Sequence, residues 1–146
     1  MYKEYLPYLG IKKIQLQGGW AKTEKQKGIY DFPWLDHIID DALARGLNPW
    51  LEASYGNPLY NNGDKEIGNS ISQTEETLVA RDHWVEAIVS RYKDKVTEWE
   101  IWNEPDGTTK EKAFNTTEHI TEFNIRTAEM YGLMALSPTM DSILRL

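Results

Sequence analysis

The chain has 146 residues, with 16 Lys and Arg against 23 Asp and Glu, and a net charge of -7. This length suffices for one domain with a buried core. An acidic chain repels phosphate backbones, so we expect no nucleic-acid partner. No stretch approaches the roughly 18 apolar residues that span a bilayer, and we expect no membrane partner. The absence of cysteine excludes disulfides and thiolate metal sites. The first residues lack a signal-peptide pattern, and the compartment stays open.

Strand and helix signals alternate from the start of the chain. Apolar residues predict a short strand over residues 12–17, which Gly18 ends. Asp31 is a good N-cap and Pro33 suits a first turn, so a helix is expected to begin there. Gly46 is expected to end this helix in the left-handed conformation.

The middle of the chain repeats this order. Residues 49–53 are rich in apolar side chains and predict a second strand. A long loop follows over residues 54–72, and loops of this length are uncommon unless they are functional. Ser72 and Glu75 predict a capping box for a helix that reaches Tyr92.

The last third predicts another strand and helix. Residues 96–102 read as the third strand, which residues 103–107 end abruptly. Thr116 or Thr117 is expected to cap a final helix. Residues 138–146 are a candidate fourth strand.

Single helices between strands indicate an α/β fold with parallel pairing. Two arrangements fit the pattern, an open doubly wound sheet and a (β/α)8 barrel. The open sheet usually has a Gly-rich phosphate-binding turn after its first strand. The Gly18-Gly19-Trp20 sequence is not such a turn, because Trp blocks close approach of the backbone.

Candidate site residues gather at the predicted carboxyl ends of the strands, where parallel α/β folds place their sites. They combine flat aromatic rings, amides and carboxylates. Such a mixture suits sugars, because rings pack against C–H faces while amides and carboxylates bind hydroxyls. The set consists of Gln17, Trp20, Glu52, Ser54, Tyr55, Asn57, Tyr60, Trp102, Asn103, Glu104 and Asp106.

The Trp-Asn-Glu-Pro sequence at residues 102–105 has the most specific chemistry. A carboxyl group flanked by Trp and Pro at a strand end can be desolvated, which raises its pKa, and a glycosidase needs such an acid to protonate the leaving oxygen. The amide of Asn103 can hold the 2-hydroxyl of a sugar. The alternative is that Glu104 only caps a turn beside Pro105.

Short motifs between Leu9 and Asp106 carry a family resemblance. They are Gly19-Trp20, Thr23-Glu24-Lys25, residues 28–32, residues 34–36, Gly46-Leu47, residues 49–51, residues 54–58 and residues 99–105. With these motifs the chain resembles the barrel glycoside hydrolases of clan A, and most nearly the family 39 group of β-xylosidase and iduronidase type. The resemblance implies that Glu104 is the general acid/base at the end of barrel strand four, and that Asn103 binds the glycone 2-hydroxyl.

The resemblance also implies that part of the enzyme lies outside this chain. A full barrel takes about 250 residues, and clan A retaining enzymes supply a nucleophilic glutamate from strand seven. We therefore expect an α/β fold that is a partial (β/α)8 TIM barrel. Residues 1–146 would form a single incomplete catalytic domain of about half a barrel, roughly strands two to five. Glu52 is the one reasonable substitute nucleophile, but it and Glu100 are expected to be structural.

Several other residues have competing interpretations. Trp20, Tyr55 and Tyr60 are either sugar platforms or loop packing. The Thr23-Glu24-Lys25 segment is most simply solvated charge. Three tryptophans are expected in the core, namely Trp50, Trp84 and Trp99. The three histidines lack ligand spacing on one helix face, so we expect no metal and no cofactor; they are His37, His83 and His119.

Two function classes follow for the chain. The first is a retaining glycoside hydrolase of oligosaccharides or polysaccharides, whose isolated segment is inactive without its nucleophile. The second is a non-catalytic carbohydrate-binding remnant of such a barrel. If the chain is only a piece of a longer protein, exposed sheet edges are expected to promote self-association.

Overall fold

The computed structural model describes residues 5–60, 74–103 and 116–134. Its strands form a three-stranded parallel sheet in the order β1-β2-β3. They are β1 (Lys13–Gln17), β2 (Asn48–Glu52) and β3 (Glu98–Glu100). The register pairs Gln17 with Glu52 and Glu52 with Glu100, so the carboxyl ends of all three strands meet at one edge. The predicted parallel α/β arrangement is confirmed; β3 is shorter than expected, and the candidate strand at 138–146 lies outside the described residues.

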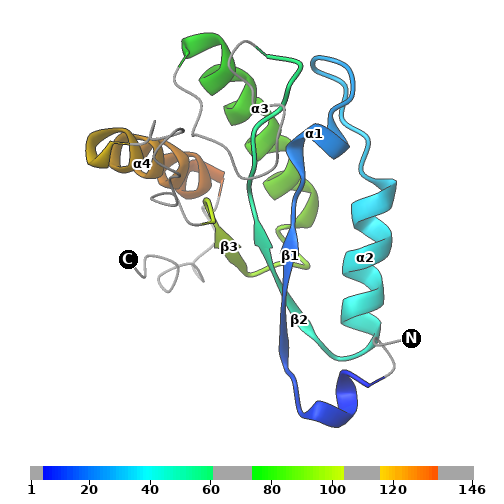
Figure 1. Ribbon diagram of the computed structural model, residues 1–146. Coiled ribbons are helices and arrows are strands. Elements are labelled where there is room, and N and C mark those ends of the chain that lie inside the picture. The colour runs from blue at the N-terminus through cyan, green and yellow to red at the C-terminus, as the bar shows by residue number, and fades with distance from the viewer. Residues whose placement is uncertain (1–4, 61–73, 104–115, 135–146) are drawn as a thin grey trace, which may run out of the picture.

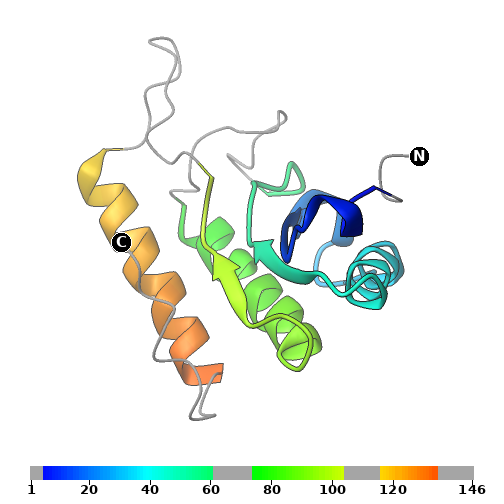
Figure 2. The same ribbon diagram turned by 90° about the horizontal axis from the view of Figure 1, so that it is seen from below.

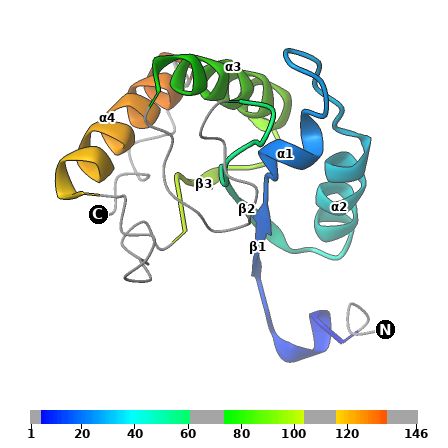
Figure 3. The ribbon, with the colours of Figure 1, turned by 45° about the horizontal axis from the view of Figure 1, so that its top comes forward.

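A helix follows each strand along the chain (Figure 1). The helices are α1 (Trp20–Thr23), α2 (Pro33–Ala44), α3 (Glu75–Tyr92) and α4 (Thr117–Met134), and a 3-10 helix at Pro7–Leu9 precedes β1. Figure 3 shows α2, α3 and α4 in an arc outside the strands, and Figure 2 shows α3 between the other two. No helix in this described part is long and apolar enough to cross a bilayer.

The ends of α2 are set by backbone geometry. Its N-cap is Phe32 without a side-chain cap, and Pro33 occupies the first turn. The expectation that Asp31 caps this helix is therefore wrong. At the other end Gly46 has a φ of 72°, and the amide of Leu47 donates to the Ala42 carbonyl at 3.0 Å. This is the predicted left-handed termination, which glycine adopts without steric cost.

The first turn of α3 is capped by Thr74, whose hydroxyl accepts from the amide of Thr77 at 3.4 Å. The predicted capping residue, Ser72, lies outside the described residues. Thr74 satisfies an amide that has no partner within the helix. The start of α3 is thus two residues later in the sequence than the capping-box pattern suggested.

The hydrophobic core lies between the sheet and the helices. Leu51 is fully buried, and Leu16 and Trp99 pack against the same cluster from the neighbouring strands. Trp84 of α3 is also fully buried. The core predictions for Trp84 and Trp99 are confirmed.

The opposite face of the sheet is polar. Lys13 forms an ion pair with Glu98. Glu100 accepts from Gln15 Nε2 at 2.6 Å and from Trp50 Nε1 at 3.1 Å. Trp50 was expected in the core, and this is wrong because strand alternation puts it on the face that carries the carboxylates.

Candidate active site

The carboxyl ends of β1 and β2 approach each other closely at Gly18. Its amide donates to the Glu52 carbonyl at 2.8 Å, and the amide of Gly19 donates to the backbone carbonyl of Ser54 at 3.2 Å. A Cβ built on Gly18 would lie 2.9 Å from the Glu52 carbonyl oxygen and 3.0 Å from Ile88 Cδ1. Glycine at this position therefore lets the strand end dock against β2.

Glu52 is a buried carboxylate at the end of β2, with an exposed fraction of 2%. The hydroxyl of Ser54 donates to it, and the side chain of Tyr55 lies near it. Burial raises the pKa of Glu52, and the neighbouring charge of Glu100 raises this pKa further, while the side chains of Ser54 and Tyr55 oppose the rise. Glu52 is thus a carboxyl group with an altered proton affinity at the strand ends where sites form.

Asn103 follows β3 and reaches the same place. Its Nδ2 donates to the Tyr55 hydroxyl at 3.1 Å. Tyr55 and Asn103 are both half-buried, so each keeps some surface open. The structure therefore brings together three of the predicted site residues: Tyr55 and Asn103 are hydrogen-bonded to each other, and Tyr55 lies near Glu52.

Trp102 is buried and has an exposed fraction of 7%. It meets Tyr55 edge-on at 5.6 Å between ring centroids and Phe123 edge-on at 5.5 Å. Its ring packs against Tyr55 and links the end of β3 to α4. The prediction that Trp102 contacts substrate stays a prediction.

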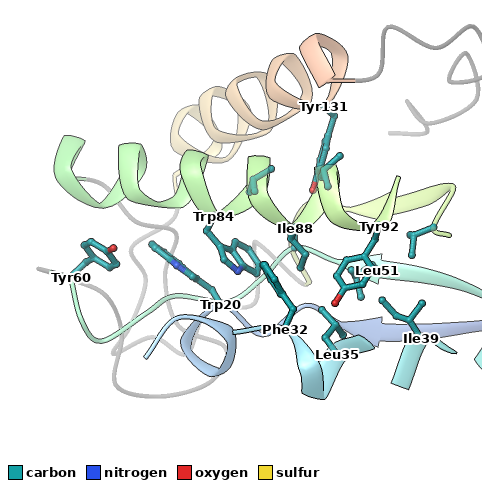
Figure 4. Packing of buried hydrophobic residues seen from close by; sticks show 14 residues of the cluster. Trp20, Phe32, Leu35, Ile39, Leu51, Tyr60, Trp84, Ile88, Tyr92 and Tyr131 are labelled. Carbon is teal, nitrogen blue, oxygen red and sulfur yellow. The ribbon is translucent and has the colours of Figure 1, made fainter. Parts of the chain in front are cut away.

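Two of the three proposed sugar platforms are core residues. Trp20 is 0% exposed and stacks on Tyr60 at 5.3 Å and on Trp84 at 5.9 Å. Figure 4 shows the ring of Trp20 between the other two. The platform prediction for Trp20 and Tyr60 is corrected accordingly, because neither ring has a face open to a ligand. Tyr55 remains the candidate platform among the three.

Glu24 lies in a place that its sequence context does not predict. It was expected in a solvated charged segment, but its exposed fraction is 0%. One carboxylate oxygen accepts from the amide of Gly28 at 2.6 Å and from the hydroxyl of Tyr60 at 2.5 Å, and the other accepts from the indole of Trp20. Thr23 is buried too and accepts from Trp84 Nε1 at 2.8 Å. A carboxylate can be buried in this way only when donors satisfy it.

Asn57 belongs to this structural group. Its exposed fraction is 1%, its Nδ2 donates to the Glu24 carbonyl at 2.9 Å, and its Oδ1 accepts from the amide of Leu59 at 3.0 Å. The prediction that Asn57 binds substrate is corrected, because its amide holds the loop after β2 against the loop after β1. Sequence spacing could not reveal this pairing across 33 residues.

The sequence also gives no sign that Arg81 of α3 is buried. It is 1% exposed, and burial lowers its pKa to about 10. Its guanidinium lies over the ring of Phe123, with 4.1 Å from Cζ to the centroid. Its Nη1 donates to the Thr127 hydroxyl at 2.9 Å, which joins α3 to α4 beside the strand ends.

The predicted acid/base, Glu104, lies outside the described residues, as does Asp106. Gln17 is exposed at the end of β1. Within residues 5–60, 74–103 and 116–134, no group of three or more His, Asp or Glu side chains could hold a metal ion.

Comparisons with known proteins point to one kind of barrel. No family model matches the chain. The β-galactosidase BgaA of Clostridium cellulovorans is 31% identical over 124 residues, which take in 68% of this chain and 18% of that protein. A family 39 glycoside hydrolase of Bacteroides cellulosilyticus WH2 superposes with a TM-score of 0.65 and 23% identity. That match covers 88% of this chain and 26% of the solved one.

A second solved structure, a β-galactosidase from Bacillus circulans sp. alkalophilus, superposes with a TM-score of 0.63 and 22% identity. That match covers 92% of this chain and 22% of the solved chain. The chain has the fold of part of a (β/α)8 barrel, and the solved barrels that it matches are glycoside hydrolases. The open-sheet alternative is thereby excluded. The chain spans about a fifth of the curated relative and about a quarter of these solved enzymes.

Proposed function

We propose that this chain carries one part of the active site of a retaining glycoside hydrolase, with Glu104 as general acid/base. The observation that supports this best is the hydrogen bond between Tyr55 and Asn103, near the buried Glu52, at the carboxyl ends of β2 and β3. Asn103 immediately precedes Glu104 in the sequence. The relation to a β-galactosidase adds to this support.

In the proposed mechanism Glu104 protonates the oxygen of the departing sugar and then activates water. Asn103 binds the 2-hydroxyl of the sugar, a contact that strengthens in the transition state. Tyr55 offers a ring for the C–H face of the sugar. The nucleophile comes from outside these 146 residues, and the substrate is a β-linked oligosaccharide or polysaccharide.

The isolated chain is expected to be inactive, because a retaining reaction needs two carboxyl groups about 5–5.5 Å apart. An aryl β-galactoside and an aryl β-xyloside incubated with the purified chain test this. Turnover that disappears in Glu104→Gln would overturn the inactivity and would point to Glu52 as nucleophile, or to pairing between chains. Sedimentation of the same sample, which measures self-association, separates these two explanations.

A hybrid enzyme tests the role of Glu104 directly. This segment would replace the matched stretch of the C. cellulovorans β-galactosidase, and Glu104→Gln would be compared with the parent hybrid. An acid/base variant should lose most activity on substrates with poor leaving groups and keep more on aryl glycosides, which need no protonation. Added azide should restore turnover with retained configuration, since azide needs no general base. Equal losses on both substrates, without azide rescue, would assign Glu104 a different role.

The second candidate is a non-catalytic carbohydrate-binding remnant. It is favoured by the Tyr55–Asn103 pair, which could bind a sugar without any nucleophile. Calorimetry with lactose or xylobiose distinguishes it from the first. Binding that survives Glu104→Gln, together with no turnover by the hybrid, would support the remnant.

A further inference from the structure

A side chain of α3 continues the connection between β2 and β3 past the paired strands. The amide of Ala53 donates to the Glu100 carbonyl at 2.7 Å, one residue beyond the last paired residue of β2. Next to this bond, Arg81 Nη2 donates to the carbonyls of Ala53 at 2.9 Å and Ile101 at 3.3 Å. One nitrogen can serve both carbonyls because each terminal nitrogen of a guanidinium carries two hydrogens in a fixed plane. Arg81 thus holds the two strand ends at one spacing.

The two clamped carbonyls lie close to the candidate site. Tyr55 comes two residues after Ala53, and Asn103 comes two residues after Ile101. Asn103 Nδ2 donates to the Tyr55 hydroxyl at 3.1 Å. This bond is near the long end of the usual range of about 2.7–3.2 Å, so a small separation of the strand ends would weaken it.

The same guanidinium also supports the site through aromatic rings. It lies over the ring of Phe123, with 4.1 Å from Cζ to the centroid. Phe123 meets Trp102 edge-on at 5.5 Å, and Trp102 meets Tyr55 edge-on at 5.6 Å. The hydrogen bond from Nη1 to Thr127 at 2.9 Å holds the guanidinium against α4. The ring of Tyr55 is therefore connected to Arg81 by packing as well as by the backbone.

We propose that Arg81 is a positioning residue of the candidate active site, which sets how the Tyr55 ring and the Asn103 amide lie relative to each other. A side chain that is 1% exposed acts through its neighbours and not on a substrate. Its hydrogen-bond partners among the described residues are neutral oxygens, and its Nε has none there. A cation buried without an opposite charge is costly, so stability alone accounts poorly for its place. The consequence for sugar hydrolysis rests on the proposed function; the positioning does not.

Nuclear magnetic resonance of the ligand-free full chain tests the positioning. Arg81→Met removes both carbonyl contacts and keeps an apolar side chain in the core. It should shift the side-chain amide signals of Asn103 and the indole signal of Trp102, because both residues follow the clamped carbonyl of Ile101. The indole signal of Trp20, on the β1 side of the core, should stay in place and shows that the chain is folded.

Arg91→Met is the matched control on the same helix, since Arg91 pairs with Asp36 at the surface. It should leave the Asn103 signals unchanged. Two results would overturn the positioning: Asn103 and Trp102 signals that match the parent in Arg81→Met, or a Trp20 signal that moves as far as they do. If Arg81→Met does not fold, Arg81→Lys keeps the test decisive. Lysine keeps the charge but has one nitrogen in place of the fork, so the Asn103 signals should still shift.

The hybrid enzyme with the C. cellulovorans β-galactosidase links the positioning to the proposed function. Arg81→Lys should lower its kcat about 10- to 100-fold and change KM less, because a displacement of about 1 Å can cost that much in rate. A merely structural role would lower the unfolding temperature and leave the kcat of the folded enzyme unchanged. Shifted Asn103 signals with an unchanged kcat would support the positioning and contradict the role of Asn103 in hydrolysis. A lower kcat without any shift of Asn103 would overturn the positioning.

Discussion

Arg81 donates from Nη2 to the carbonyl oxygen of Ala53 at 2.9 Å, and the same nitrogen reaches the carbonyl of Ile101 at 3.3 Å. Ala53 follows the last residue of β2, and Ile101 follows the last residue of β3. One guanidinium on α3 therefore sets the spacing between the two strand ends that hold Glu52 and Asn103. Its Nε has no partner among the described residues, so its burial is not fully compensated.

Replacing Arg81 with methionine should lower the free energy of unfolding by about 2–4 kcal/mol. Two buried carbonyls would each lose a hydrogen-bond donor, which costs roughly 1–3 kcal/mol per carbonyl. Removing a buried cation that has no carboxylate partner would offset part of that loss. Urea unfolding followed by tryptophan fluorescence measures the change. Arg91→Met is the matched control, because the Arg91–Asp36 ion pair is partly exposed and should contribute at most about 1 kcal/mol. An Arg81→Met chain as stable as the parent would contradict the clamp.

Glu24→Gln should destabilise the chain by about 2 kcal/mol. The replacement keeps the size of the side chain but turns an NH2 group toward at least one donor, so that hydrogen bond is lost. Hydrogen bonds to charged groups are worth roughly 1.5–3 kcal/mol. Lys25→Gln is the control in the same segment, since Lys25 is exposed and the change should stay within about 0.5 kcal/mol. Similar effects for the two variants would show that Glu24 is not the anchor of these loops.

Gly18→Ala should destabilise the chain by about 1–3 kcal/mol, because the new methyl group would meet the Glu52 carbonyl oxygen at 2.9 Å. Gly132→Ala provides the opposite control. Gly132 lies in α4 with open space around its Cβ position, and alanine there should stabilise the helix by about 0.5–1 kcal/mol. Thermal unfolding of both variants gives the comparison, and a neutral Gly18→Ala would mean that β1 can shift away from β2.

Stability should fall in alkaline solution. Burial, with nearby Glu24, raises the pKa of Tyr30 to about 12, and burial also raises the pKa values of Tyr60, Tyr92 and Tyr131. The folded chain keeps these protons where the unfolded chain has lost them, so stability is complete below about pH 10 and is lost above it. Arg81, with its lowered pKa, acts in the opposite direction but is one group against four.

Urea midpoints between about pH 8 and pH 11 check this dependence. Tyr131→Phe should make the fall shallower at little cost at neutral pH, because the Tyr131 hydroxyl is buried without a partner in the described part of the chain. A midpoint that rises with pH would contradict the sign of the effect.

The order of strands and helices could be predicted from local signals. The strand expected at residues 49–53 is found at Asn48–Glu52, and the helix before it is terminated by the left-handed Gly46 as expected. These features depend on side-chain periodicity and on the steric freedom of glycine, which are properties of a few neighbouring residues. Grouping Glu52, Tyr55 and Asn103 needed only the rule that parallel strands end at one edge.

The roles of Trp20, Tyr60 and Glu24 could not be predicted in the same way. A Trp after a strand can serve a ligand or the core, and a Thr-Glu-Lys segment normally lies in solvent. Here the indole and hydroxyl donors of Trp20 and Tyr60 converge on Glu24, and Tyr60 comes from a loop 36 residues further along the chain. Burial of the carboxylate became favourable only when those donors were brought to it.

By itself the sequence determined the alternation of strands and helices, the parallel sheet and the Trp-Asn-Glu-Pro motif, because each depends on local spacing and residue type. The tertiary structure decided which aromatic rings fill the core, which charged groups are buried, and which side chains remain at the strand ends to meet a ligand. Those outcomes depend on whether distant donors and apolar surfaces arrive at the same place, since the cost of burying Glu24 or Arg81 is offset only by partners far away in the chain.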